Sequence, residues 1–366
     1  VRRPARLHRG AARHRPAGVR LNDWGGEALL ERRHDETGAV FLVAIHSSRL
    51  GPATGGTRMM AYPSLEAARA DAMRLAEAMT YKWAAAGFPR GGGKAVIALP
   101  GPPPRGDARA VLLRRYGTLL RELSGRFWTG GDVGTSSADM DVIAETGAPY
   151  VFSRTPAHGG AGGSGEWTAL GVFAAIETVC ARLFGAATPL GRSVVVQGTG
   201  SVGAPLVERL AAAGARVAWS DPSPAAAERW RGRPELTALD PASCLEAPAD
   251  LLVPCALGRV LSRESIPRLS CRAVVGAAND QLAEPADGGR LRDRGILYAP
   301  DFVVNAGGAV AITGMEAMGW PAARARREVL RIGETLSRVF ALADREGITT
   351  EVAARRLAEQ RLYESR

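Results

Sequence analysis

The sequence predicts an α/β protein of two domains. Three observations support this. Strand-like and helical segments alternate in the first part of the chain, a glycine-rich stretch occupies residues 159–165, and a dinucleotide-type glycine pattern occupies residues 198–203. A length of 366 residues is enough for two domains that each have a core.

The elements of the first part follow from hydrophobic periodicity. Residues 64–79 predict a helix, because Ser64 can cap it and apolar residues recur at helical spacing. The other elements expected here are strands at 40–45, 95–99 and 126–129 and a helix at 107–124. The stretch 159–165 (GGAGGSG) has the composition of a hinge between domains, and equally that of a surface loop.

The second part of the chain holds a glycine motif between a strand and a helix. We expect a helix at 167–184, a strand at 193–197 (SVVVQ), a helix at 204–213 and a strand at 216–219. The motif GTGSVG consists of Gly198, Thr199, Gly200, Ser201, Val202 and Gly203. A GxGxxG pattern alone is a weak signal, but a strand before it, a helix after it and an acid at the end of the next strand make it a strong one.

The residues of this motif have separate roles in binding a dinucleotide. Gly198 permits a tight turn, Gly200 lets the backbone approach a pyrophosphate, and Gly203 lets the helix pack closely on the strand. Asp221 would accept hydrogen bonds from the adenosine ribose and repel a phosphate on it. Because no arginine follows Asp221 until Arg229, we expect NAD rather than NADP. The alternative is that the glycines only form turns.

Lysine is nearly absent from the chain. Of 47 lysines and arginines, only Lys82 and Lys94 are lysines. An arginine stays protonated in a protein, whereas burial or a neighbouring cation can bring an ammonium group toward neutrality. The two positions therefore indicate proton chemistry, unless they are simply the few lysines left in an arginine-rich composition. Lys94 follows the run Gly91-Gly92-Gly93, and Lys82 lies at the end of the predicted helix.

Charge and composition argue against several other classes. The net charge of +10 is concentrated at the start of the chain, where residues 1–20 hold seven arginines and no acid. We expect residues 1–21 to be a disordered basic extension, and we do not expect nucleic acid as a partner. This segment lacks the apolar core of a secretory signal, and no long uninterrupted apolar run predicts a membrane span, so we expect a cytoplasmic protein.

Other site motifs are missing from the sequence. The four cysteines form no CxxC pair, and His34, His46 and His158 have no metal-ligand spacing, so no metal site is predicted. Gly93-Lys94 does not complete a phosphate-binding loop, because Ala95 stands where such a loop needs serine or threonine. No GxSxG nucleophile motif is present.

Six ordered segments of the chain resemble the Glu/Leu/Phe/Val amino-acid dehydrogenases. These segments are 51–58 (GPATGGTR), 79–82 (MTYK), 91–94 (GGGK), 131–135 (GDVGT), 254–258 (PCALG) and 305–308 (NAGG). Three others, at 126–130, 137–141 and 295–302, look most similar to actinobacterial phenylalanine dehydrogenases. The resemblance implies a substrate and oligomerisation domain at 22–155, a Rossmann-type NAD-binding domain at 156–320, helices at 321–366 that pack back on the first domain, and a homo-oligomer.

The resemblance also implies the chemistry and its residues. The reaction would be the reversible oxidative deamination of an L-amino acid to a 2-oxo acid and ammonia. Lys82 would hold the substrate α-carboxylate, Lys94 would polarise water and the developing carbonyl, and Asp132 would exchange protons with the amine. The substrate side chain would lie among Thr54, Gly55, Gly56, Met79, Gly130, Ala309 and Ile312. Thr168, Asn279 and Asn305 would join the glycine motif in binding the cofactor.

Two small residues set the expected substrate. Gly130 stands where members specific for aliphatic side chains tend to have alanine, and Ala309 where leucine dehydrogenases tend to have valine. A deep uncharged pocket favours L-phenylalanine, with a leucine or valine dehydrogenase, or a non-catalytic ligand-binding paralogue, as the alternatives. Gly130 could instead only relieve backbone strain. Two positions depart from the family pattern: Trp83 follows Lys82, and Asp280 replaces an asparagine.

Overall fold

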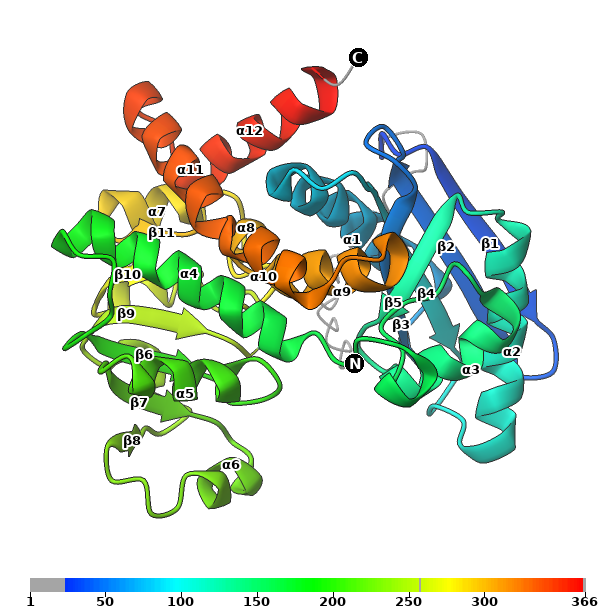
Figure 1. The fold of residues 1–366 in the computed structure, drawn as a ribbon, viewed down its shortest axis with the longest axis horizontal. Coiled ribbons are helices and arrows are strands. Elements are labelled where there is room, and N and C mark those ends of the chain that lie inside the picture. Colours follow the sequence, from blue (N-terminus) through cyan, green and yellow to red (C-terminus); the bar gives the residue numbers. More distant parts are fainter. Residues whose placement is uncertain (1–23, 257, 365–366) are drawn as a thin grey trace, which may run out of the picture.

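The computed structural model describes residues 24–256 and 258–364, which form two sheets with helices around each. Figure 1 shows the sheets on opposite sides of the molecule, with helices α9 (Gly307–Met318) and α10 (Ala322–Leu330) between them. The predicted α/β class with two domains is confirmed. The basic extension expected at residues 1–21 lies outside the described residues, and the domain limits 22–155, 156–320 and 321–366 stay a prediction.

The first sheet has five strands in the order β1-β2-β4-β3-β5. Their bounds are β1 Ala28–His34, β2 Ala39–Ser47, β3 Ala53–Ala61, β4 Gly91–Leu99 and β5 Phe127–Gly131. Strand β2 pairs antiparallel with β1 and β4, whereas β3 pairs parallel with β4 and β5. The carboxyl ends of β3, β4 and β5 therefore point to the same edge of the sheet.

Both faces of this sheet are covered, which explains its continuous apolar runs. Alternate residues of β2 and β4 pack on helix α1 (Leu65–Ala86) on one face. The intervening residues pack on helices α2 (Gly106–Glu122) and α3 (Ser137–Gly147) on the other. Ser64 caps α1 as expected, accepting a hydrogen bond from the Ala67 amide at 3.1 Å. The helix runs past residue 79 to Ala86, so Lys82 lies within its last turns.

Strand β3 was not predicted from the sequence, although it lies between the predicted strands β4 and β5. Its sequence ATGGTRMMA mixes glycine, threonine and arginine, so it shows neither a long apolar run nor a clean alternation. The edge strand β1 and helix α3 were also not predicted.

The second sheet is parallel throughout, in the order β11-β10-β9-β6-β7-β8. Its strands are β6 Ser193–Gln197, β7 Arg216–Ser220, β8 Leu236–Ala238, β9 Ala249–Pro254, β10 Cys271–Val274 and β11 Leu297–Tyr298. The first strand in sequence stands in the middle, and the chain winds outward to either side of it. This is the doubly wound order of dinucleotide-binding folds. The expected strands at 193–197 and 216–219 are β6 and β7.

Helices and short 3-10 turns complete the second half. Their bounds are α4 Gly165–Phe184, α5 Gly203–Ala212, α6 Pro224–Arg229, α7 Asp287–Asp293, α8 Asp301–Val304, α11 Ile332–Glu346 and α12 Thr350–Glu364, with turns at Pro156–His158, Cys244–Glu246 and Ile266–Arg268. Within the described residues, α4 is the one helix long and apolar enough to cross a membrane. More than half of it is buried against α5, α9 and α11, as in a core helix.

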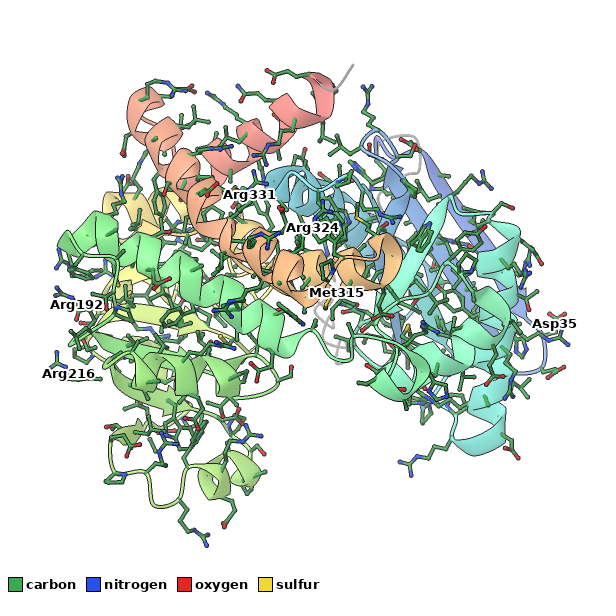
Figure 2. All side chains as sticks on the ribbon, in the orientation of Figure 1. Asp35, Arg192, Arg216, Met315, Arg324 and Arg331 are labelled. Atoms are coloured by element: carbon green, nitrogen blue, oxygen red, sulfur yellow. The ribbon has the colours of Figure 1, made fainter. Side chains whose placement is uncertain are left out.

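The C-terminal helices return to the first sheet. Helix α11 packs on α4, and α12 packs on α1. Arg361 of α12 donates a hydrogen bond to the Ala84 carbonyl at 2.8 Å, and Tyr81 of α1 donates one to Glu359 at 3.4 Å. Figure 2 shows Met315 and Arg324 near the middle of the molecule, on the two helices that lie between the sheets. The predicted packing of these helices on the first domain is confirmed.

Candidate active site

A cavity of about 280 Å³ lies between the two sheets. Its walls come from β3, β4, β5 and α1 on one side and from α9 and the loop after β10 on the other. The predicted residues that line it are Gly55, Gly56, Met79, Lys82, Lys94, Asp132, Thr168, Val202, Asn279, Asn305, Ala309 and Ile312. The fold thus gathers at one cavity residues that are more than 250 positions apart in sequence.

Lys94 is the buried cation of this cavity, with 6% of the residue exposed. The three glycines before it let β4 pass close under its neighbours: a Cβ on Gly92 would overlap Thr80 of α1, and one on Gly93 would lie 2.8 Å from the Phe127 ring. Lys94 Nζ lies 2.7 Å from Oδ2 of Asp132, which directly follows β5. A buried ammonium and a carboxylate therefore meet at the carboxyl edge of the first sheet.

Asp132 also contacts a second cation. Arg58 of β3 donates from Nε to Asp132 Oδ2 at 3.2 Å. Burial alone would raise the pKa of Asp132, but the charges of Lys94 and Arg58 outweigh burial and lower this pKa to about 2. The carboxylate is therefore ionised at neutral pH and can accept a proton once a ligand displaces one of its cations.

Lys82 approaches the cavity from α1. Its Nζ donates to Oδ1 of Asn279 at 3.2 Å, which joins the helix to the loop after β10. Burial, helped by the charge of Lys94 and opposed by that of Asp301, lowers the pKa of Lys82 to about 8. Near neutral pH this lysine is still mostly protonated, so it can pair with a carboxylate.

Asn305 offers an unused acceptor at the cavity. Its Nδ2 donates to Asn279 Oδ1 at 2.8 Å and to the Ala277 carbonyl at 3.1 Å. Its own Oδ1 is buried and has no hydrogen-bond partner among the described residues. Because a buried polar atom without a partner is costly, this oxygen fits a ligand that carries an amide N–H, as the carboxamide of nicotinamide does.

The glycine motif has the shape that a pyrophosphate requires. A Cβ on Gly203 would overlap the carbonyl oxygen of Gly198, so only glycine lets α5 begin this close to β6. A Cβ on Gly200 would meet nothing within 4 Å, so the space in front of this loop is open. The arrangement suits a phosphate at the N-terminus of α5.

Asp221 is held at the end of β7 by this same loop. Its Oδ2 accepts from the Thr199 amide at 2.7 Å and its Oδ1 from the Ser223 amide at 2.9 Å. Arg229 reaches back from α6 and donates to the Thr199 carbonyl at 2.7 Å. Arg229 is separated from Asp221 in the sequence, but the fold brings it to the same loop.

Two predicted substrate contacts, Thr54 and Gly130, are not among the residues that line the cavity, and their role at the substrate stays a prediction. Thr54 is fully buried, and its carbonyl accepts a hydrogen bond from Trp83 Nε1 at 2.8 Å. A Cβ on Gly130 would lie 2.5 Å from the ring of Phe152. Gly130 thus makes room for Phe152, which is itself a wall of the cavity, and not directly for a ligand.

Sequence reasoning missed several side chains at the cavity, among them Arg58, Phe152 and Thr313. Arg58 lies inside the TGGTR segment, in which only Thr54, Gly55 and Gly56 were predicted to contact the substrate. Thr313 follows the predicted contact Ile312; its hydroxyl is buried and has no partner among the described residues. Phe152 lies in a segment without regular structure and had no local signal. Its position becomes visible only when β5 and the following loop are folded together.

The described residues contain no group of three or more histidines, cysteines or acids placed to hold a metal ion. All four cysteines are free thiols, and burial raises the pKa of Cys255 and that of Cys271 to about 12. The site therefore consists of lysine, arginine, aspartate and amide groups.

Comparison with known proteins assigns the chain to a family. Residues 34–148 match the model of the Glu/Leu/Phe/Val dehydrogenase dimerisation domain, and residues 225–329 match that of Glutamate/Leucine/Phenylalanine/Valine dehydrogenase. The chain belongs to the Glu/Leu/Phe/Val dehydrogenase family. It is an L-amino-acid dehydrogenase, and the nicotinamide-dependent chemistry of this family agrees with the glycine motif and with the free oxygen of Asn305.

Several members of the family are similar over nearly their whole length. A leucine dehydrogenase of Geobacillus stearothermophilus is 39% identical over 92% of this chain and 90% of its own. A valine dehydrogenase of Streptomyces coelicolor is 41% identical over 94% of each chain. The crystal structure of L-tryptophan dehydrogenase from Nostoc punctiforme superimposes with a TM-score of 0.80 at 36% identity, covering 94% of this chain and 98% of that one.

Proposed function

We propose that this amino-acid dehydrogenase catalyses the reversible, NAD-dependent oxidative deamination of a large apolar L-amino acid, with L-phenylalanine as the first choice. The observation that carries the proposal is the contact of 2.7 Å between Lys94 and Asp132 in a cavity that Lys82 also lines. Lys82 is available to pair with the α-carboxylate of the substrate, and Lys94 and Asp132 are available as an acid and a base at the α-amine.

In this proposal the side chains bind the substrate and move its protons. Lys82 pairs with the α-carboxylate, and this orients the α-carbon toward the cofactor side of the cavity. The glycine motif and Asn305 would hold NAD, which when bound would accept the hydride of the α-carbon. Asp132 takes a proton from the substrate ammonium group, for which its ionised state suits it.

Lys94 acts in the second half of the reaction, the hydrolysis of the imine. Removal of the hydride and one amine proton leaves a protonated imine, and water adds to its carbon. Lys94 orients the attacking water and then stabilises the developing carbonyl oxygen by donating hydrogen bonds, while Asp132 returns its proton to the departing amine. The two protons of the attacking water go to solvent, so the substrate, NAD and water give the 2-oxo acid, ammonia, NADH and two protons.

The apolar end of the cavity supports a large apolar substrate. Met79, Phe152, Ala309 and Ile312 provide hydrophobic walls, and the α9 residues that line the cavity, Gly308, Ala309, Ile312 and Thr313, are uncharged. Ala309 is a small residue, so it leaves space for a large side chain at this end of the cavity. The space at Gly130, by contrast, is filled by Phe152, so this glycine no longer argues for an aromatic substrate.

Leucine or valine is the second candidate substrate. The Phe152 ring narrows the cavity beside Gly130, which favours a smaller side chain. The similar leucine and valine dehydrogenases point the same way. One methylene group changes the discrimination of a hydrophobic pocket by only about 1 to 3 kcal/mol, so several apolar amino acids should turn over at different rates.

NAD is proposed over NADP because of Asp221. Its carboxylate stands where the adenosine ribose should lie and would repel a ribose phosphate. Arg229 lies nearby but is engaged with the Thr199 carbonyl. Comparing the rates with NAD and with NADP tests this choice directly.

We also propose that the protein forms a homo-oligomer. Residues 34–148 match a model described as a dimerisation domain, which supports assembly through the first sheet or its helices. Light scattering on the purified protein tests this part of the proposal, and a monomer mass would contradict it.

The test of the substrate is NADH formation by purified protein with NAD and each L-amino acid in turn, at alkaline pH. We expect turnover with phenylalanine and slower turnover with other apolar side chains. A specificity constant for leucine or valine that is about tenfold higher than for phenylalanine would replace the first candidate by the second. No turnover with any amino acid would refute the proposed function.

A further inference from the structure

Five charged side chains of alternating sign connect the candidate site to the far wall of the cavity. Asp132 contacts Arg58 Nε at 3.2 Å, and Arg58 Nη1 contacts Asp71 Oδ2 at 2.8 Å. Asp71 Oδ1 accepts from Arg74 Nη2 at 2.8 Å, and Arg74 Nη1 pairs with Asp280. We call this series the ion-pair chain.

The contact between Arg58 and Asp71, inside the ion-pair chain, is largely buried. The side chains of Arg58 and Asp71 are only 20% and 17% exposed. Tyr62 adds a hydrogen bond from its hydroxyl to Asp71 Oδ2 at 2.7 Å. Burial would raise the pKa of Asp71, but the hydrogen bonds of Tyr62 and Arg74 and the charge of Arg58 lower it, so Asp71 remains an anion that orients both arginines.

The last link crosses between the two halves of the molecule. Arg74 lies on α1, which packs on the first sheet, whereas Asp280 lies in the loop after β10 of the second sheet. Asp280 adopts a left-handed backbone conformation with φ of 52°, which aspartate tolerates better than most residues. The adjacent residue Asn279 is the one that Lys82 and Asn305 both reach. A tether on Asp280 therefore also fixes the acceptor that faces Lys82.

We propose that Arg74 and Asp280 form a latch that holds the cleft closed and keeps Asn279 against Lys82. The latch is anchored through Asp71 and Arg58 on Asp132. Its two members are positioning residues: neither lies where the reacting atoms would be. The inference extends the proposed function, on which its kinetic part rests, and gives a role to the aspartate that departs from the family pattern at position 280.

Separation of the two sheets would break the Arg74–Asp280 pair. Its side chains are 49% and 42% exposed, so water and salt compete for it. The closed state should therefore weaken with ionic strength, and it should weaken when either partner is neutralised. An exposed ion pair contributes about 0.2 to 1 kcal/mol, which corresponds to a change of roughly 1.4- to fivefold in a rate or equilibrium constant.

The kinetic test compares Asp280→Asn, Arg74→Gln and the double variant. Each single variant should lower kcat/KM for L-phenylalanine by about 1.4- to fivefold. The double variant should fall no further than Arg74→Gln, because that variant has already lost the Arg74–Asp280 pair together with the pair to Asp71. Added salt should lower the wild-type value toward that of the variants and leave theirs nearly unchanged. The matched control is Arg69→Gln, since Arg69 also lies on α1 but pairs with Glu31 and Glu66 beside the first sheet. It should behave like the wild type.

A second readout does not depend on turnover. Small-angle X-ray scattering should give a larger radius of gyration for Asp280→Asn and Arg74→Gln than for the wild type, and salt should expand only the wild type and the control. Equal radii for all variants, or losses of kcat/KM that add in the double variant, would overturn the latch. Absence of turnover with every amino acid would refute the proposed function, while the scattering comparison would still decide on the latch.

Discussion

The ammonium nitrogen of Lys94 lies 2.7 Å from a carboxylate oxygen of Asp132. The two groups come from β4 and from the end of β5, which lie on either side of β3 in the sheet order. Arg58 of that middle strand touches the same carboxylate. A buried acid and base at one point, beside a second lysine, are the elements that a deamination requires.

Replacing Asp132 by asparagine should abolish proton transfer without changing the size of the side chain. We expect kcat to fall about 100- to 10,000-fold, the usual contribution of a general acid or base, with a small change in KM. Steady-state kinetics with L-phenylalanine measure this. Asp107→Asn at the exposed start of α2 is the control and should be fully active. A loss of less than about tenfold would remove Asp132 from the proton path.

The pKa of Lys82 predicts how ligand affinity depends on pH. Because this pKa is about 8, the amine is charged below pH 8 and becomes neutral above it. A carboxylate ligand without an amine, such as 3-phenylpropanoate, should bind well below pH 8 and lose up to about tenfold in affinity for each pH unit above it. The Lys82→Arg variant should lose this dependence, since arginine stays charged. Affinity that is constant across pH 8 in the wild type would show that Lys82 does not bind the carboxylate.

The Gly130→Ala variant should disturb Phe152. The new methyl group would lie 2.5 Å from the Phe152 ring, so the ring must move. We expect a loss of about 1 to 3 kcal/mol in the free energy of unfolding and a shift of specificity from phenylalanine toward leucine. Thermal unfolding and the ratio of kcat/KM for the two substrates measure both effects. In the Phe152→Ala background the same substitution should cost less stability than in the wild type, because the clashing ring is gone. An equal cost in both backgrounds would show that the two residues do not act as a pair.

The Asp221→Ser variant should relax the choice of cofactor. It removes the carboxylate and leaves Arg229 beside the loop, where a ribose phosphate could use it. We expect kcat/KM with NAD to fall about tenfold or more, as for the loss of hydrogen bonds to a charged group, and kcat/KM with NADP to rise. Glu228→Gln, an exposed acid on α6, is the control. An unchanged ratio of the two cofactors would place the adenosine ribose elsewhere.

The sequence predicts much of this fold because local signals and the final structure agree. The strand SVVVQ, the motif GTGSVG and the following helix appear as β6, the loop and α5, and Asp221 stands at the end of β7. The alternating burial of β2 and β4 also follows from their apolar runs. Strand β3 was missed because its glycines and polar residues serve the cavity rather than a core.

The site is less accessible to sequence reasoning, because side-chain directions depend on the tertiary structure. The resemblance placed Thr54 and Gly130 at the substrate, but Thr54 holds Trp83 and Gly130 accommodates Phe152. The sequence marks Asp280 only as a departure from the family pattern. Its partner Arg74 is more than 200 residues away in sequence, so only the folded chain reveals that this charge is paired.

Turnover by the Lys94→Arg variant tests the central claim most directly. Arginine keeps the positive charge at this position, but it cannot give up a proton and its larger planar head cannot replace the 2.7 Å contact with Asp132 in the same space. NADH formation and the dissociation constant for NAD should be measured on the same preparation. We expect turnover to fall at least about 100-fold while NAD binding stays within about twofold of the wild type. Turnover close to that of the wild type would contradict the role of Lys94 in the reaction.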